Sequence, residues 1–307
     1  MEKQVCRPIL VTGAGSGIGN YLVKYLAARG HIVYGAARRE DDLLELGKID
    51  NVIPVRLDVR DFRQVREAEI LVREQGTGLY GLVNNAGLGE LGMLSTWTED
   101  ELANIFDVNV FGPFRMTNAF LNLLLESEGR IVNIGSQGGV ITYKYYGPYT
   151  MTKHALEAYT DTLNYELEPY GVRASIVQPG GIATNIGAKS MEGNIARFKR
   201  AKAPFDEEAK QILTGLETAP AANDEEESET NRKPSSPEIV ATAVYEALFS
   251  ERPKLRYLVG TRWEGNRVLK ALLAQLLDEN DNPQHNYSRD QLVALLDQQI
   301  LDRQDSG

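Results

Sequence analysis

The sequence predicts an α/β fold: a Rossmann-like, doubly wound sheet of seven parallel strands flanked by helices, with a helical C-terminal extension. Short apolar runs alternate with helical patterns, and a glycine-rich turn joins the first run to the first helix. Such alternation is typical of a parallel sheet covered on both faces. The strand candidates are residues 8–12, 31–37, 51–57, 78–84, 129–135, 172–178 and 255–260. The helix candidates are residues 18–29, 61–75, 99–125, 149–168 and 237–249.

The alternation of strands and helices predicts one domain over residues 1–262 and a helical extension over residues 263–307. Inside the domain, residues 186–236 form an insertion, and its acidic part, residues 217–236, is expected to be mobile or disordered. The extension holds two apolar stripes at helical spacing. We expect them to pack on the parent domain, with a subunit contact or a hydrophobic lid as alternatives. The stripes are Val268, Leu269, Leu272, Leu273, Leu276 and Leu277, then Leu292, Leu295, Leu296 and Ile300.

The composition excludes several classes of protein. Lys+Arg 33 against Asp+Glu 43 gives a formal net charge of -10, which argues against a nucleic-acid-binding surface. The single cysteine, Cys6, and the widely spaced His31, His154 and His285 predict no disulfide and no metal site. No apolar run reaches the roughly 18 residues of a membrane span, and the first residues do not resemble a signal peptide. A cytoplasmic protein is expected.

The glycine-rich segment TGAGSGIG follows the first predicted strand directly. Glycines at Gly13, Gly17 and Gly19 permit a tight turn and let a pyrophosphate approach the positive end of the helix. This placement predicts a dinucleotide site.

The residue type at the end of the second strand indicates whether the adenosine ribose of that dinucleotide carries a 2′-phosphate. An acidic residue there selects NAD, whereas arginine accommodates a 2′-phosphate. Ala37 occupies that position and is followed by Arg38 and Arg39, whose planar guanidinium groups match phosphate geometry. NADP(H) is therefore favoured over NAD(H). The alternative is a pair of solvated arginines neutralised by the acidic residues 40–42.

Tyr149 and Lys153 are four residues apart and therefore share one helix face. A nearby cation lowers the pKa of a phenol and prepares it to exchange a proton near neutral pH. Ser136 ends the fifth predicted strand, and ligands of such sheets bind beyond the carboxyl ends of the strands. Ser136, Tyr149 and Lys153 together supply the two donors and the cation that a ketone oxygen needs.

The segments TGAGSGIG, LDV, NNAG, a serine thirteen residues before YxxxK, and PGGIAT occur in this order over about residues 7–262. Their order resembles the short-chain dehydrogenase/reductase family, and specifically its hydroxysteroid and retinol dehydrogenase-like branch. The resemblance implies an NADP(H)-dependent enzyme that interconverts a ketone or aldehyde and an alcohol by hydride transfer. It also implies a homodimer or homotetramer, and a mobile loop over the substrate within the insertion.

The resemblance assigns roles residue by residue. Tyr149 is the general acid or base, Lys153 lowers its pKa and binds the nicotinamide ribose, and Ser136 donates to the substrate oxygen. Asn109 holds a water that relays protons. The residues implied in cofactor binding are Gly13, Ser16, Gly17, Ile18, Gly19, Arg38, Arg39, Asp58, Val59, Asn85, Ala86, Gly87, Tyr149, Lys153, Pro179, Gly180, Ile182 and Thr184.

A small apolar carbonyl or alcohol is the expected substrate, because the segments that flank the site carry few charges. The candidate substrate residues are Leu88, Leu91, Met93, Gln137, Val140, Tyr143 and Tyr146. Steroid, retinoid, fatty-chain and small xenobiotic carbonyls all stay open. Two other classes are weighed: a non-catalytic NADP-sensing regulator, which usually lacks the tyrosine or lysine, and a sugar-nucleotide epimerase, whose glycines are usually spaced differently.

Overall fold

The computed structural model describes residues 6–184, 186–217, 226–229 and 231–305. Within them, the strands form a seven-stranded sheet in the order β3-β2-β1-β4-β5-β6-β7, and all neighbours are parallel. The predicted fold class is confirmed. The strands are β1 Ile9–Val11, β2 Val33–Ala37, β3 Val52–Arg56, β4 Gly81–Asn84, β5 Arg130–Ile134, β6 Arg173–Pro179 and β7 Arg256–Val259.

The direction of winding reverses beside β1. Ile9 pairs with Val33 of β2 on one side and with Gly81 of β4 on the other. The chain therefore builds the sheet outward from β1 in one direction and then restarts at β4 in the other. A crevice at the carboxyl ends of the strands is expected at such a switch point, because the flanking connections leave to opposite faces.

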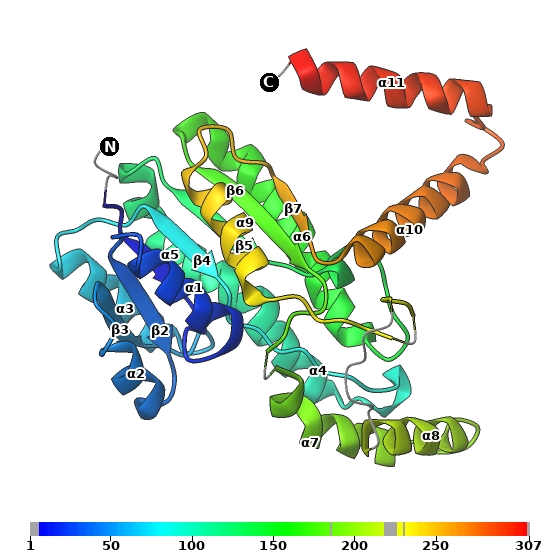
Figure 1. The fold of residues 1–307 in the computed structure, drawn as a ribbon, viewed down its shortest axis with the longest axis horizontal. Coiled ribbons are helices and arrows are strands. Elements are labelled where there is room, and N and C mark those ends of the chain that lie inside the picture. The colour runs from blue at the N-terminus through cyan, green and yellow to red at the C-terminus, as the bar shows by residue number, and fades with distance from the viewer. Residues whose placement is uncertain (1–5, 185, 218–225, 230, 306–307) are drawn as a thin grey trace. The chain divides into compact units, whose positions relative to one another are not determined.

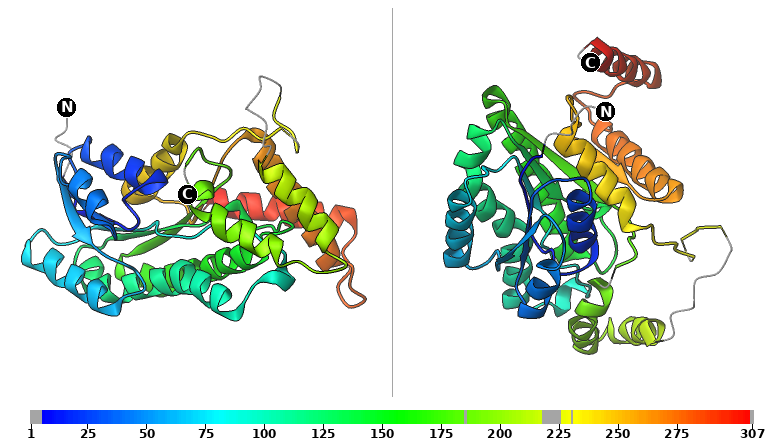
Figure 2. Two further views of the ribbon diagram at one scale, coloured as in Figure 1. Left: turned by 90° about the horizontal axis from the view of Figure 1, so that it is seen from below. Right: turned by 60° about the vertical axis from the view of Figure 1, so that its left-hand side comes forward.

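Helices cover both faces of the sheet (Figures 1 and 2). One buried cluster joins the sheet to α1 and α9 through side chains such as Leu22, Leu26 and Val244. A second cluster joins the other face to α3, α5 and α6, with Phe120 fully buried in it. The bounds of these helices are α1 Gly17–Ala27, α3 Phe62–Glu74, α5 Gly112–Glu126, α6 Gly147–Leu167 and α9 Pro237–Phe249.

The structure contains helices that the sequence pattern did not predict: α2 Glu40–Leu46, α7 Ile186–Lys199 and α8 Asp206–Glu217. The helix predicted over residues 99–125 is also interrupted, because α4 (Glu99–Phe106) and α5 are joined by a π-helical turn, Asp107–Phe111. Such turns occur frequently at functional sites. Here the turn contains the buried Asn109.

The described residues divide into two compact units, residues 1–265 and 266–307. The second unit comprises most of α10 (Arg262–Asn280) and all of α11 (Arg289–Asp305), so the predicted helical extension is present. Whether its apolar stripes pack on the parent domain stays a prediction. None of the helices that the structure describes is long and apolar enough to cross a membrane.

Much of the acidic segment predicted to be disordered, including residues 218–225, lies outside the described residues. Its C-terminal end runs beside the turn that follows β6. The Ser235 amide donates to the Gly181 carbonyl at 2.8 Å, and the Ala183 amide donates to the Ser235 carbonyl at 2.9 Å. The insertion therefore ends in contact with the predicted PGGIAT site segment.

Candidate active site

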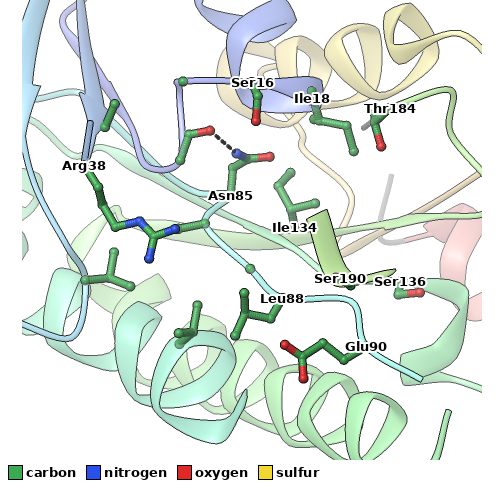
Figure 3. Close-up of a pocket in the computed structure, with 18 of the residues that line it drawn as sticks. Ser16, Ile18, Arg38, Asn85, Leu88, Glu90, Ile134, Ser136, Thr184 and Ser190 are labelled. Carbon is green, nitrogen blue, oxygen red and sulfur yellow. Dashed lines mark hydrogen bonds between the residues drawn. The ribbon is translucent and has the colours of Figure 1, made fainter. Parts of the chain in front are cut away.

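A cleft of about 490 Å³ opens at the carboxyl ends of the strands (Figure 3). The structure brings most of the predicted cofactor residues together there, with the predicted catalytic residues Ser136, Tyr149 and Lys153. The predicted residues that line the cleft are Gly13, Ser16, Gly17, Ile18, Arg38, Arg39, Asp58, Val59, Asn85, Ala86, Gly87, Leu88, Ser136, Tyr149, Lys153, Pro179, Gly180, Ile182 and Thr184.

The glycine-rich turn between β1 and α1 needs its glycines for two reasons. Gly13 has a φ of 67° and Gly17 a φ of 56°, a left-handed region that other residues rarely adopt. Gly19 does not line the cleft. A Cβ atom on Gly19 would lie 2.4 Å from both Asn85 Nδ2 and the Gly13 carbonyl oxygen. Gly19 therefore permits the close packing that shapes the turn.

Thr12, which the sequence reasoning missed, fastens the end of β4 to this turn. Its Oγ1 accepts from the amides of Asn85 at 2.9 Å and Ala86 at 3.0 Å. The Asn85 side chain donates back to the carbonyls of Thr12 at 2.8 Å and Gly13 at 3.3 Å, the latter dashed in Figure 3. The two segments therefore meet as one rigid edge of the cleft.

Charged side chains gather at the end of the cleft near β2 and β3. Asp58 Oδ2 lies 2.7 Å from Arg60 Nη2 and 3.8 Å from Arg38 Nη1. Hydrogen bonds from Arg60 are the main reason that the pKa of Asp58 is lowered. Arg39 Nε lies 3.5 Å from Asp42 Oδ2. Arg60 and Asp42 line the cleft as well, although the sequence reasoning had not assigned them to it.

Tyr149 lies at the start of α6, beside Ser136 at the end of β5. Burial raises the pKa of Tyr149 to about 12, partly opposed by a side-chain hydrogen bond with Ser136. That Lys153 lowers this pKa, as the family resemblance implies, stays a prediction. Lys153 Nζ is 5.8 Å from the Tyr149 ring centroid. The phenol is therefore fully protonated at neutral pH.

Lys153 is 6% exposed, and its ammonium donates to the Ile134 carbonyl at 2.8 Å. Burial lowers the pKa of Lys153 to about 8, and the charge of Glu157 opposes this effect. Burial also raises the pKa of Glu157. Its carboxylate accepts from Gln178 Nε2 at 2.8 Å and from Arg256 Nε at 3.0 Å. The lysine therefore sits where modest changes of environment alter its charge near neutral pH.

Asn109 lies behind the cleft wall and is not among the lining residues. Its Oδ1 accepts from the Leu88 amide at 2.8 Å, and its Nδ2 donates to the Leu88 carbonyl at 2.9 Å and to Thr152 Oγ1 at 3.0 Å. These bonds fasten the segment after β4 to α6. Both amide hydrogens are used, while Oδ1 retains capacity for a second donor.

Of the predicted substrate residues, only Leu88 lines the cleft. Met93 is buried with Phe198 and Ala209, and Leu91 packs at the edge of that cluster. Gln137 is also buried, and its Nε2 donates to the Val259 carbonyl at 3.3 Å.

The other three predicted substrate residues, Val140, Tyr143 and Tyr146, do not line the cleft either. The ring of Tyr146 lies between those of Tyr143 and Tyr149, with centroids 6.1 and 6.0 Å away. The lining therefore includes little of the apolar wall that the sequence predicted.

Helix α7 is bound to the segment after β4 by charged and polar side chains. Arg197 is almost fully buried, forms an ion pair with Glu90, and lies 3.3 Å from Glu101 Oε1. Its guanidinium lies 3.8 Å from the Trp97 ring centroid. Asn194 Oδ1 accepts from the Leu91 amide at 2.8 Å. These contacts bring Glu90 and Ser190 to the cleft, two lining residues that the sequence reasoning missed.

The turn after β6 is held by Glu264, which has no exposed surface. Its Oε1 accepts from the Gly181 amide at 2.8 Å and from Arg232 Nη2 at 2.5 Å, and its Oε2 accepts from the Thr261 amide at 3.1 Å. A Cβ atom on Gly180 would lie only 2.1 Å from Oε2. Gly180 is therefore required for this carboxylate to reach the turn.

A family model described as short chain dehydrogenase matches residues 7–194, which is more than half of the chain. The chain belongs to the short chain dehydrogenase family. The resemblance predicted from the motifs is thus confirmed, and the family is one of oxidoreductases. The match covers the glycine-rich turn, Ser136, Tyr149 and Lys153.

Relatives within the short chain dehydrogenases act as dehydrogenases or reductases by their names. The mitochondrial D-beta-hydroxybutyrate dehydrogenase of Bos taurus is 33% identical over 67% of this chain and 62% of its own length. The 3-ketodihydrosphingosine reductase of Bacteroides thetaiotaomicron is 38% identical over 60% of this chain and 66% of its own length. The NADPH-dependent 3-dehydrocapnine reductase of Ornithobacterium rhinotracheale is 32% identical over 83% of this chain and 89% of its own length. The chain thus spans less than two thirds of the length of the first two.

Solved structures of short chain dehydrogenases share the fold. One from Streptomyces avermitilis superposes with a TM-score of 0.72 at 28% identity, covering 91% of this chain and 96% of its own. One from Burkholderia cenocepacia, in complex with NADP, has a TM-score of 0.66 at 23% identity, covering 90% of this chain and 99% of its own.

Proposed function

We propose that the chain is an NADP(H)-dependent oxidoreductase that interconverts a carbonyl compound and an alcohol, with Tyr149 as the general acid and base. The observation that carries the proposal is the meeting of Ser136, Tyr149 and Lys153 in one cleft with the glycine-rich turn. A regulator without chemistry has no need of a buried lysine beside a buried, protonated tyrosine. Perturbed pKa values in a cleft are typical of catalytic groups.

The lining residues fit a dinucleotide. Gly13 and Gly17 leave the backbone at the start of α1 uncovered by side chains, which suits a pyrophosphate. Arg38, Arg39 and Arg60 supply guanidinium groups for a 2′-phosphate at the other end. When bound, NADPH supplies the hydride.

The preference for NADP(H) rests on the same end of the cleft. Ala37 lines the cleft in place of the carboxylate that would bind a free 2′-hydroxyl. Asp58 and Asp42 are both paired with arginines, so negative charge does not dominate this end of the cleft. The name of the Ornithobacterium relative, an NADPH-dependent reductase, supports this preference.

Different residues donate the proton, bind the carbonyl oxygen and relay protons. The phenol of Tyr149 gives its proton to the carbonyl oxygen, since its pKa of about 12 keeps it protonated. Ser136 Oγ accepts from the Gly138 amide at 3.0 Å and is hydrogen-bonded to Tyr149, so its hydroxyl would turn from the phenol to the carbonyl oxygen when a substrate binds. Lys153 holds positive charge close by, and the free lone pair of Asn109 Oδ1 is suited to a relay water. A protonated tyrosine favours the reducing direction.

Other expectations stay predictions. They are a homodimer or homotetramer, a cytoplasmic location, and a lid over the substrate formed by residues 186–236. The burial of Met93 removes one apolar side chain from the predicted substrate wall. The NADP-sensing regulator is the second candidate function, and the experiment below separates the two.

The test is Tyr149→Phe. We expect turnover of a carbonyl panel with NADPH to fall below detection, while the NADPH dissociation constant, measured by fluorescence titration, stays within about twofold because the phenol is not a phosphate contact. Retained turnover would refute the role of Tyr149. NADPH binding with no turnover by the unmodified protein on any carbonyl would favour the regulator.

A further inference from the structure

The charged residues of the cleft are unevenly distributed. The lining includes Arg38, Arg39, Asp42, Asp58, Arg60, Glu90 and Lys153. The first five gather near β2 and β3, and the Lys153 ammonium donates a hydrogen bond to the Ile134 carbonyl. Glu90 lies apart from them, on the side of the cleft that holds Leu88 and Ser136 (Figure 3). It is therefore a carboxylate that lines the cleft away from the arginine-rich end.

The Glu90 side chain is held in a fixed orientation. It is 16% exposed, and its Oε2 is bound by Arg197 Nη2. Arg197 is in turn fixed by the Leu91 carbonyl at 3.2 Å and by Asn194 Oδ1 at 3.3 Å. The ion pair uses Oε2, so Oε1 retains its lone pairs for a donor in the cleft.

Glu90 belongs to a cluster of two carboxylates and two guanidinium groups. Arg197 also lies 3.3 Å from Glu101, so that one guanidinium is shared between two carboxylates. The second cation of the cluster, Arg200, pairs with Glu101 at 2.5 Å and is 40% exposed. The cluster as a whole is neutral, and Arg197 divides its contacts between the two carboxylates, so Glu90 Oε1 can still accept a hydrogen bond from a donor in the cleft.

We propose that Glu90 is a specificity-determining residue that binds a protonated amino group on the substrate, next to the reacting carbonyl. A carboxylate held in place and partly shielded from water forms a strong charge-assisted hydrogen bond with an ammonium. The substrate class is then an amino ketone, or the corresponding amino alcohol. This inference rests on the proposed oxidoreductase function and narrows its substrate.

The test compares two ketones of matched shape, 1-aminooctan-2-one and nonan-3-one, in which a methyl group replaces the ammonium. We expect the native protein to show a kcat/KM at least about tenfold higher for the amino ketone, since a hydrogen bond to a charged group contributes that much. Glu90→Gln keeps the shape and an acceptor but removes the charge. It should abolish the preference while leaving the NADPH dissociation constant unchanged.

Glu101→Gln is the matched control, because Glu101 belongs to the same cluster but does not line the cleft. It should keep the preference. Equal kcat/KM for both ketones in the native protein, or a preference that survives in Glu90→Gln, would overturn the inference while leaving the oxidoreductase function intact. Loss of the preference in both variants would show that it depends on how Arg197 is held. That result would likewise contradict a direct role of Glu90. Turnover of neither ketone nor any other carbonyl would instead count against the proposed function itself.

Discussion

The two ends of the cleft are built from different kinds of contact. The cofactor end joins neighbouring strand ends through backbone groups and short side chains, as in the bonds between Thr12 and Asn85. The other end joins segments far apart in the chain through long charged side chains, as in the pairs Arg197–Glu90 and Arg232–Glu264. The first end depends on the sheet, and the second depends on where the insertion comes to lie.

The difference indicates which properties should be separable by mutation. Contacts at strand ends are expected to control cofactor binding without affecting how α7 is held. Contacts made by α7 are expected to control the substrate side and the stability of the insertion. Mutations at each end test this division.

The largest effect is expected from Arg197→Met at the substrate end. The change leaves Glu90 and Glu101 without a buried partner, which costs about 3–5 kcal/mol of unfolding free energy in comparable pairs. Urea unfolding followed by circular dichroism measures this cost, with Lys199→Met on the same helix as an exposed control. A loss below about 1 kcal/mol would show that the ion pairs do not hold α7. NADPH affinity should change little in the folded protein, and a large loss would contradict the division.

An intermediate effect is expected from Arg38→Ala at the cofactor end. Removing a guanidinium from a 2′-phosphate should weaken NADPH by about tenfold, since a hydrogen bond to a charged group is worth about 1.5–3 kcal/mol. NADH should weaken by less than about threefold. Paired fluorescence titrations measure both dissociation constants. Equal losses of affinity for the two cofactors would show that Arg38 does not bind the 2′-phosphate.

Near neutral pH the smallest effect is a pH dependence that separates the two ends. Lys153, with a pKa lowered to about 8, carries its charge below that pH and loses it above. Tyr149 stays protonated over this range, so kcat/KM for reduction should be level below pH 8 and fall about tenfold per unit well above it. Asp58, whose pKa is lowered, stays charged throughout, so Arg38→Ala should leave the midpoint unchanged. A profile flat to pH 10 would contradict the assignment to Lys153.

The fold and the cofactor end could be predicted because their signals are local. Alternating apolar runs specify buried strands, and parallel strands bring residues such as Gly13, Asn85 and Ser136 to one edge wherever the connecting helices run. The motifs therefore contain most of the residues that line the cleft. The π-helical turn at Asn109 was missed, since it replaces only one turn of a helical pattern.

The substrate end could not be predicted because it depends on long-range packing. Residues that follow a strand leave the sheet edge, and their side chains can point into the cleft or away from it, as Glu90 and Met93 do. The insertion has no strong apolar periodicity, so α7 and its contacts gave no sequence signal. The raised pKa of Tyr149 has the same origin, because burial is a property of the folded surroundings.

The carboxylate of Glu264 has a consequence for where the chain can be divided. Glu264 follows the last strand and lies within the helix that begins the C-terminal extension, yet its oxygens complete the turn that carries Gly180 and Gly181. A truncation at residue 262, where the strand pattern ends, would remove a support of the catalytic cleft. A junction for a fusion partner belongs beyond residue 265, where the first compact unit ends.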